Sequence, residues 1–230
     1  MGFIMNKIVI YTAIFGGKDN LLEPDFIPDN CDFICFTDSS FHSPVWQIRS
    51  GEMYNNDPVR SARRYKILAH KFLPEYEHSI WIDGNFILRG DVNTLINKVL
   101  FKNPMAVYDH VKTIGDSRNT VQAEAEAIAI LAKKGNFKDD PVIIHKQLNI
   151  YKDLGFKDDN GLISSGILFR RHNEKNVIKT MEDWWQELVK YSRRDQISFN
   201  YAAWKNHLDF IYIQENIRDN LFFNMKQHKK

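Results

Sequence analysis

Apolar residues follow two patterns along this chain. Short unbroken apolar runs predict strands over residues 8–15, 31–37, 46–49, 79–83, 105–108, 165–170 and 210–213, with extended chain also at 86–88. Apolar residues at helical spacing predict helices over 60–72, 91–99, 116–134, 141–154, 176–191 and 195–206. This alternation of strands and helices predicts an α/β fold, with a mostly parallel central sheet and helices on both faces.

Length and composition indicate a single globular domain. The 230 residues contain no internal repeat and no linker, so we expect one domain over 1–230. Hydrophobic residues make up 43% and charged residues 26%, which is ordinary for a globular protein. The net charge of +2 gives no reason to expect nucleic acid as a partner.

The cysteines and the N-terminal run bear on location. Cys31 and Cys35 lie in one predicted strand, too few for a four-cysteine zinc site, and we expect reduced thiols and a cytoplasmic protein. The run from Lys7 to Phe15 is too short to span a bilayer, so no transmembrane segment is expected. Membrane contact would be peripheral, through the basic tail from Lys226 to Lys230.

A carboxylate stands where one apolar strand is predicted to end. Asp83 follows Ile80-Trp81-Ile82, and Gly84 and Asn85 come next. Asp and Asn oxygens suit a hard divalent ion, Mn²⁺ or Mg²⁺, and Gly84 leaves room for a diphosphate. Asp-Gly and Gly-Asn are also common turn signals, so a simple turn is the alternative.

The first predicted strand ends at a second candidate site. Ligands of open α/β sheets bind at the carboxyl ends of the strands, and a nucleotide base there would lie against Tyr11 or Phe15. Gly16-Gly17 belongs to no Walker or GxGxxG pattern. The segment is otherwise a core strand and its turn.

Four cations share one predicted helix. Arg60, Arg63, Arg64 and Lys66 are spaced so that members three or four apart share a face. Together they could hold a diphosphate, or they could form a solvated basic face.

Three further groups are candidates. Asp195-Gln196 opens a predicted helix, where Asp195 is either an N-cap or a carboxylate that contacts a sugar or acts as a base. The small residues from Gly161 to Gly166, including Ser165, leave room for a ligand or form an ordinary turn. His110 and His228 could each complete a metal site.

Taken together, these segments resemble a glycosyltransferase-like domain family long catalogued as a domain of unknown function. Its members occur in bacterial polysaccharide loci and among plant Golgi proteins linked to cell-wall or mucilage polysaccharides. The matching text is Tyr11-Thr-Ala-Ile-Phe-Gly-Gly17, Cys35-Phe-Thr-Asp38, Asp57-Pro-Val-Arg60-Ser-Ala-Arg63-Arg-Tyr-Lys66, Pro74-Glu-Tyr76, Ser79-Ile-Trp-Ile-Asp-Gly-Asn85, Arg118 with Glu124, Gln147 with Tyr151 and Gly155, Trp184-Trp185, and Arg194-Asp-Gln-Ile-Ser-Phe-Asn-Tyr201. The resemblance covers nearly the whole chain.

The resemblance implies a GT-A-like, Rossmann-related domain that binds a nucleotide sugar. Residues 1–100 would bind the nucleotide and 101–230 the acceptor. Asp83-Gly84-Asn85 would stand for the family's Asp-x-Asp metal element, with Asn85 in place of the second carboxylate. Metal ligands would be Asp83, Asn85 and His228, and Asp195, Gln196 and Asp83 would act in catalysis. The nucleotide sugar would contact Tyr11, Thr12, Ala13, Phe15, Gly16, Asp38, Arg60, Arg63, Lys66, Gly84, Ser165 and Gly166.

The expected activity is transfer of a sugar from a nucleotide-diphosphate donor to a saccharide acceptor, in polysaccharide or surface-glycan synthesis. Asp195 would be the base if the reaction inverts the anomeric carbon, and would position the sugar if it retains it. Two alternatives stay open at this point. One is a sugar nucleotidyltransferase, and the other is a carbohydrate-binding protein with a degenerate site.

Overall fold

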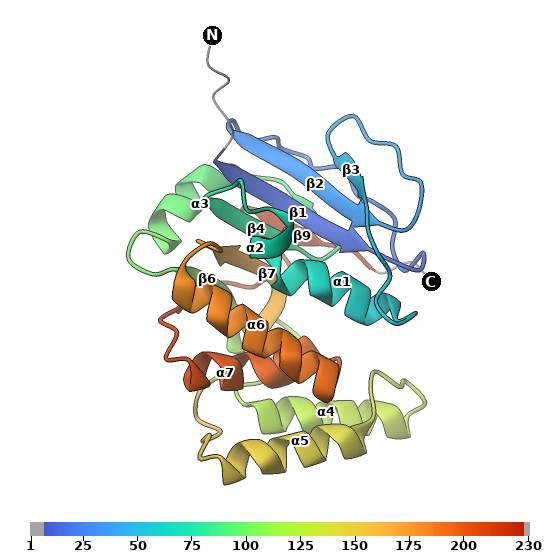
Figure 1. The fold of residues 1–230 in the computed structure, drawn as a ribbon, viewed down its shortest axis with the longest axis vertical. Helices are drawn as coiled ribbons and strands as arrows, with labels where there is room; N and C mark the ends of the chain where they lie inside the picture. Colours follow the sequence, from blue (N-terminus) through green and yellow to red (C-terminus); the bar gives the residue numbers. More distant parts are fainter. Residues whose placement is uncertain (1–6, 228–230) are drawn as a thin grey trace.

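A seven-stranded sheet forms the centre of the computed structural model, which describes residues 7–227 (Figure 1). The strands lie in the order β3-β2-β1-β4-β7-β6-β8. Their bounds are β1 Ile8–Ile14, β2 Cys31–Thr37, β3 Gln47–Ser50, β4 His78–Ile82, β6 Met105–Asp109, β7 Ile163–Arg170 and β8 Ile211–Ile213. Only β7 runs against its neighbours β4 and β6 in this sheet of the described residues. The predicted mostly parallel sheet is confirmed.

Side chains of the central strands alternate between two hydrophobic clusters. On β1, Val9 and Tyr11 pack into the cluster on one face, while Ile10 and Ile14 pack into the cluster on the other. Residues from before and after position 100 occur in both clusters, so the two halves proposed from the sequence share one core.

Helices cover both faces, as predicted. The first face carries α1 (Pro58–Ile67), α2 (Ala69–Phe72), α6 (Lys175–Lys190) and α7 (Asp195–Lys205). The second carries α3 (Val92–Val99) and a two-stranded sheet of β5 (Phe86–Leu88) and β9 (Phe223–Met225). The helices α4 (Val121–Lys133) and α5 (Pro141–Asp153) lie side by side beyond α7, at the bottom of Figure 1. A short 3-10 helix, η1 (His110–Lys112), follows β6.

Several predicted boundaries were wrong. The predicted helix over 60–72 is two helices, because Leu68 leaves helical geometry between α1 and α2. Gly161 to Gly166 is not a turn throughout, since β7 already begins at Ile163 and pairs with β6. The helix predicted from residue 116 begins at Val121, after the N-cap Thr120. The short elements η1 and β9 lack a periodic pattern and were not predicted.

Two observations concern the location expected from the sequence. Cys31 and Cys35 are buried and free, and burial raises the pKa of each thiol to about 12. Within residues 7–227, every helix is too short or too polar to cross a bilayer. The cytoplasmic location stays a prediction.

Candidate active site

A cavity of about 560 Å³ opens at the carboxyl ends of β1 and β4. Ala13 and Phe15 line it from the end of β1, and Asp83 with Gly84 from the end of β4. Asp195 reaches the same cavity from the first turn of α7. The loop after β4 and the start of α7 thus meet here, although more than a hundred positions separate them in the sequence.

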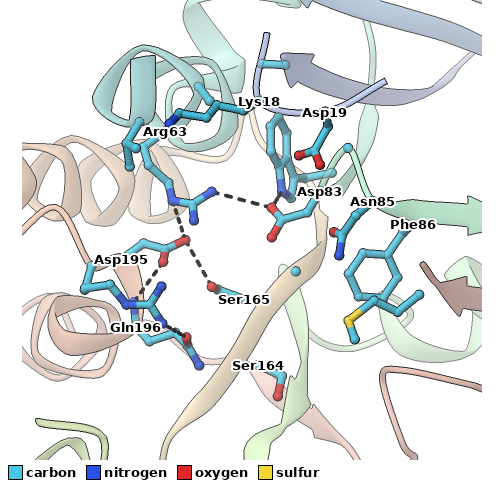
Figure 2. Close-up of a pocket in the computed structure, with 18 of the residues that line it drawn as sticks. Lys18, Asp19, Arg63, Asp83, Asn85, Phe86, Ser164, Ser165, Asp195 and Gln196 are labelled. Atoms are coloured by element: carbon cyan, nitrogen blue, oxygen red, sulfur yellow. Dashed lines mark hydrogen bonds and ion pairs between the residues drawn. The ribbon is translucent and has the colours of Figure 1, made fainter. Parts of the chain in front are cut away.

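Two cations join the two carboxylates. Lys66 Nζ lies 2.6 Å from Asp195 Oδ2 and 3.3 Å from Asp83 Oδ1. Arg63 Nε lies 3.1 Å from Asp195 Oδ2, and one of its terminal nitrogens lies 3.6 Å from Asp83 Oδ1. Figure 2 shows the Arg63 guanidinium between the two carboxylates. We call Arg63, Lys66, Asp83 and Asp195 the charged floor; Arg63, Asp83 and Asp195 line the pocket, whereas Lys66 is fully buried and does not line it.

The sheet fixes Lys66 through its backbone. Lys66 lies in the last turn of α1, where helix carbonyls lack intrahelical partners. Its carbonyl accepts hydrogen bonds from Tyr11 Oη at 2.7 Å and from the Arg170 guanidinium at 2.8 Å. The carbonyl of Ile67 accepts another from Arg170 at 3.2 Å. These buried donors from β1 and β7 take the place of water, and they accompany the break at Leu68.

Opposite charges in the floor favour the ionised forms of Asp195 and Arg63, whereas the pKa of Lys66 is shifted the other way. Burial alone would raise the pKa of Asp195, but Arg63, Lys66 and Arg194 hold it well below its usual range. Burial would lower the pKa of Arg63, but Asp195 and Asp83 keep it above the ordinary value. The pKa of Lys66 is lowered by its burial and by the neighbouring Arg63. The neighbouring cations therefore favour the carboxylate form of Asp195.

Asp195 does not act as the N-cap of α7. The N-cap is Arg194, whose side chain makes no capping hydrogen bond. Asp195 is the first helical residue and is 1% exposed, and besides the two cations it accepts a hydrogen bond from Ser165 Oγ at 3.0 Å. Trp184 Nε1 donates to the Asp195 carbonyl at 3.0 Å, which fixes the start of the helix. The capping alternative is thus excluded.

Asp83 and Asn85 present oxygen atoms with different surroundings. Asp83 Oδ1, the oxygen that faces Lys66 and Arg63, also accepts a hydrogen bond from Trp81 Nε1 at 2.7 Å. The side-chain amide of Asn85 donates to the backbone carbonyl of Lys226 at 3.0 Å, and the backbone carbonyl of Asn85 accepts from the backbone amide of Lys226 at 2.7 Å. These two hydrogen bonds hold the C-terminal segment against Asp83-Gly84-Asn85, the metal-binding element proposed from the sequence. His228, the third proposed ligand, lies outside the described residues.

The described residues contain no cluster of three or more His, Cys, Asp or Glu side chains suited to a metal ion. His110, the other histidine considered, lines the pocket but interacts with Arg118, whose backbone amide donates to its Nδ1 at 3.2 Å. A hard ion that takes two protein oxygens and completes its shell with phosphate and water still fits the donor set of Asp83 and Asn85.

The turn after β1 brings two charged residues to the pocket. Gly16 has a φ of 62°, and a Cβ there would lie 2.7 Å from the Pro58 ring. Its amide donates to both carboxylate oxygens of Asp38 at 3.1 Å. Asp38 therefore shapes the turn that delivers Lys18 and Asp19, which both line the pocket.

Some predicted contacts are not brought to the pocket. Tyr11 and Thr12 are buried in the sheet, at 0% and 1% exposure, and neither lines the cavity. The Arg60 guanidinium donates to the carbonyls of Leu188 and Tyr191, both at 2.9 Å, and so faces the end of α6.

The remaining predicted residues do line the pocket or support it. Gln196 lines it, and its amide donates to the Ile163 carbonyl at 2.9 Å. Ser165 and Gly166 line it from β7, and a Cβ on Gly166 would lie 2.8 Å from the Phe86 ring. Phe15 lines it as well but is 1% exposed and stacks on Tyr65, so its ring belongs to the core.

Sequence reasoning missed several pocket residues. Those with charged or aromatic side chains are Lys18, Asp19, Trp81, Phe86, Asp116, Phe137, Lys138, Arg194 and Arg218. Arg194 had a usable signal, since it belongs to the motif around Asp195, and its guanidinium bridges Glu124 and Gln196 at 2.9 Å each. Phe137 and Lys138 lie in a polar stretch between two helices that carries no such signal.

Two similar proteins can be compared with this chain. A solved structure, "WbbM bifunctional glycosytransferase apo structure", covers 92% of this chain and 40% of its own, with 11% identity and a TM-score of 0.45. At that TM-score the likeness supports no statement about the site. "Probable hexosyltransferase MUCI70" of Arabidopsis thaliana is 25% identical over 225 residues, which cover 84% of this chain and 36% of the plant protein. The chain thus spans about a third of that relative's length.

A family model provides the stronger finding. The model described as "TOD1/MUCI70, glycosyltransferase-like domain" matches residues 37–229, a range that contains β3 to β9, Asp83 and Asp195. The resemblance stated from the sequence is therefore confirmed, and this chain belongs to the TOD1/MUCI70 glycosyltransferase-like domain family.

Proposed function

We propose that this protein is a glycosyltransferase that moves a hexose from a nucleoside-diphosphate sugar to a saccharide acceptor, in polysaccharide or surface-glycan synthesis. The observation that carries the proposal is that Asp83 and Asp195, which both line one pocket, converge on Lys66 and Arg63. Family membership and the plant hexosyltransferase relative support the reaction class.

The charged floor suits a diphosphate leaving group. Negative charge develops on the diphosphate as the glycosidic bond breaks, and fixed cations aimed at it lower the barrier. Arg63 lines the pocket, and Lys18 lines it from the turn after β1. Gly84 has no side chain to obstruct a diphosphate beside Asp83.

Divalent metal would bind at the Asp83 and Asn85 oxygens, with His228 as the third ligand expected from the sequence. A bound ion would supply further positive charge to the diphosphate. Arg63 already supplies some of that charge, so we propose a transferase that metal assists. Asn85 in place of a carboxylate makes the protein part of the site weaker.

Asp195 fits a positioning role better than the role of a general base. A carboxylate with a pKa held far below neutral takes up a proton poorly, and its Oδ2 already receives Lys66 and Ser165. We propose that Asp195 orients these groups and Arg63, and that Gln196 beside it contacts the donor sugar.

The test uses UDP-, GDP-, CMP- and dTDP-sugars with and without Mn²⁺. We expect one nucleotide class to raise the melting temperature, to a larger extent with Mn²⁺, and the same donor to be hydrolysed or transferred. Asp83→Asn and Asp195→Asn should each lower turnover roughly 100- to 1,000-fold. Asp153→Asn, at an exposed position near the end of α5, is the matched control.

Three results would count against the proposal. Wild-type turnover in both variants, if they are folded, would show that the charged floor takes no part in the reaction. Release of inorganic diphosphate in place of a nucleoside diphosphate would indicate a nucleotidyltransferase. Binding of a nucleotide sugar with no turnover under any condition would indicate a degenerate binding protein.

A further inference from the structure

One exposed aromatic ring lines the active-site pocket. Three aromatic side chains of the described residues are classed as exposed, namely Phe26 at 41%, Phe101 at 77% and Phe137 at 62%. Of these three, Phe137 alone lines the pocket, next to Lys138. Burial of a phenylalanine ring is favourable, so an exposed ring that lines this pocket calls for a ligand that covers it.

The loop that carries Phe137 is fixed to the chain beside Asp195. Asp139 Oδ2 accepts hydrogen bonds from Ser192 Oγ at 2.6 Å and from the Arg193 amide at 2.9 Å. Ser192 is 1% exposed and lies three positions before Asp195. Because Asp139 is two positions after Phe137, the ring is tied to the Asp195 side of the pocket.

The position of Phe137 assigns the ring to the acceptor and not to the donor nucleotide. In the proposed reaction the diphosphate lies by Asp83 and the reacting sugar between Asp83 and Asp195. The acceptor then approaches from the Asp195 side, where the loop with Phe137 is attached. Lys138 and Arg194 line the same pocket and can donate hydrogen bonds to hydroxyl groups.

The chemistry of the ring fits a sugar. An aromatic face carries negative charge density, and one face of a pyranose presents C–H groups of slight positive charge. A flat apolar ring with polar donors at its side matches a molecule that is apolar on its faces and polar around its edge.

We propose that Phe137 is the stacking platform of the acceptor subsite, where it covers a pyranose ring while Lys138 binds hydroxyl groups at its edge. This inference rests on the proposed function, because a saccharide bound at Phe137 is an acceptor only if the protein transfers a sugar to it. Binding of a saccharide at Phe137 is a separate property that can be measured without turnover.

The first experiment measures binding without a donor. Saturation-transfer NMR is recorded with the methyl α- and β-glycosides of glucose, galactose and mannose against wild type, Phe137→Ala, Phe137→Trp and Phe101→Ala. We expect saturation of the pyranose C–H protons in wild type, its loss in Phe137→Ala, and its retention in the other two variants. Phe101→Ala removes a ring that is even more exposed, at 77%, and does not line the pocket.

The second experiment separates acceptor from donor. Transfer is assayed with the nucleotide sugar that the protein hydrolyses and the glycoside that binds best. Phe137→Ala should raise the KM for that glycoside roughly 2- to 12-fold and leave the rate of donor hydrolysis unchanged. A higher donor KM would assign the ring to the nucleotide base and overturn the inference, as would glycoside binding absent from wild type or unchanged in Phe137→Ala. Glycoside binding that needs Phe137, in a protein that turns over no donor, would uphold the platform and reject the transferase.

Discussion

The charged floor and the exposed ring of Phe137 lie in one pocket, but different forces hold them in place. In the floor, Lys66 is 0% exposed and Asp195 1%, and each has an ionic partner within 3 Å. Phe137, which we call the rim of the pocket together with its loop from residue 134 to 140, is 62% exposed, and that loop is attached through Asp139 to Ser192 and Arg193. Burial of charge is tolerated only when every group is paired, so the floor has one arrangement before any ligand arrives. The exposed ring of Phe137 contributes less to the fold than the buried ion pairs of the floor.

The largest expected effect comes from removal of the buried lysine. Lys66→Met keeps the length of the side chain but leaves Asp195 with one cation fewer in a buried site. Loss of one partner from a buried ion pair costs about 3–5 kcal/mol, so the free energy of unfolding should fall by about that amount. Urea unfolding followed by tryptophan fluorescence measures it, since Trp81 and Trp184 are both buried in the core.

Lys71→Met is the matched control for this change. Lys71 is half exposed in α2 and pairs with Glu182 at 2.9 Å, so its removal should cost less than about 1 kcal/mol. If the two variants lost the same stability, the floor would not depend on Lys66 and the contrast with the rim would fail.

The sequence predicts the floor well because its residues obey local rules. Asp83 ends an apolar run, which is costly unless the carboxylate is paired. Asp195 is a candidate because it opens a predicted helix, although the N-cap of that helix is Arg194. The helical spacing of Arg60, Arg63 and Lys66 could not tell which cations enter the pocket. That choice is made by the end of α6, whose carbonyls bind Arg60, and no periodicity encodes a contact 128 positions away.

Two other features lay beyond sequence reasoning. Tyr11 has the aromatic character suited to a nucleotide base, yet its hydroxyl is used to hold the end of α1. Its role depends on Arg170 beside it, which comes from the antiparallel strand β7. Phe137 belongs to a lysine-rich turn in which no apolar period points to a ligand.

A smaller effect tests whether Asn85 belongs to the floor as a structural amide. Asn85→Asp restores a second carboxylate but loses the hydrogen bond to the Lys226 carbonyl. Without metal, we expect a loss of about 1–3 kcal/mol, because two oxygens then face each other in a buried place. Mn²⁺ should restore much of that loss and raise the melting temperature more than it does in wild type.

Asn93→Asp is the control for this exchange. Asn93 lies in α3 and its amide also donates to a backbone carbonyl, that of Asp29 at 3.1 Å, at an exposed place outside the pocket. An equal Mn²⁺ response in both variants would mean that the ion does not bind at position 85. No Mn²⁺ response in Asn85→Asp would exclude this position as a ligand and leave Asn85 as a clamp for the C-terminal segment.

The smallest expected effect concerns the attachment of the rim. Asp139→Ala removes the hydrogen bonds to Ser192 and Arg193 and should cost only about 1 kcal/mol, because the carboxylate is partly exposed. Since the ring of Phe137 is then less well placed, the acceptor KM should rise, by less than in Phe137→Ala, while donor hydrolysis stays unchanged. Asp140→Ala, next in the chain, removes the N-cap of α5 and not the link to Ser192, so it should lower stability by a similar amount without a change in acceptor KM. Equal KM changes in both variants would show that the rim responds to general loosening of the loop, and the attachment through Asp139 would then have no special part in binding the acceptor.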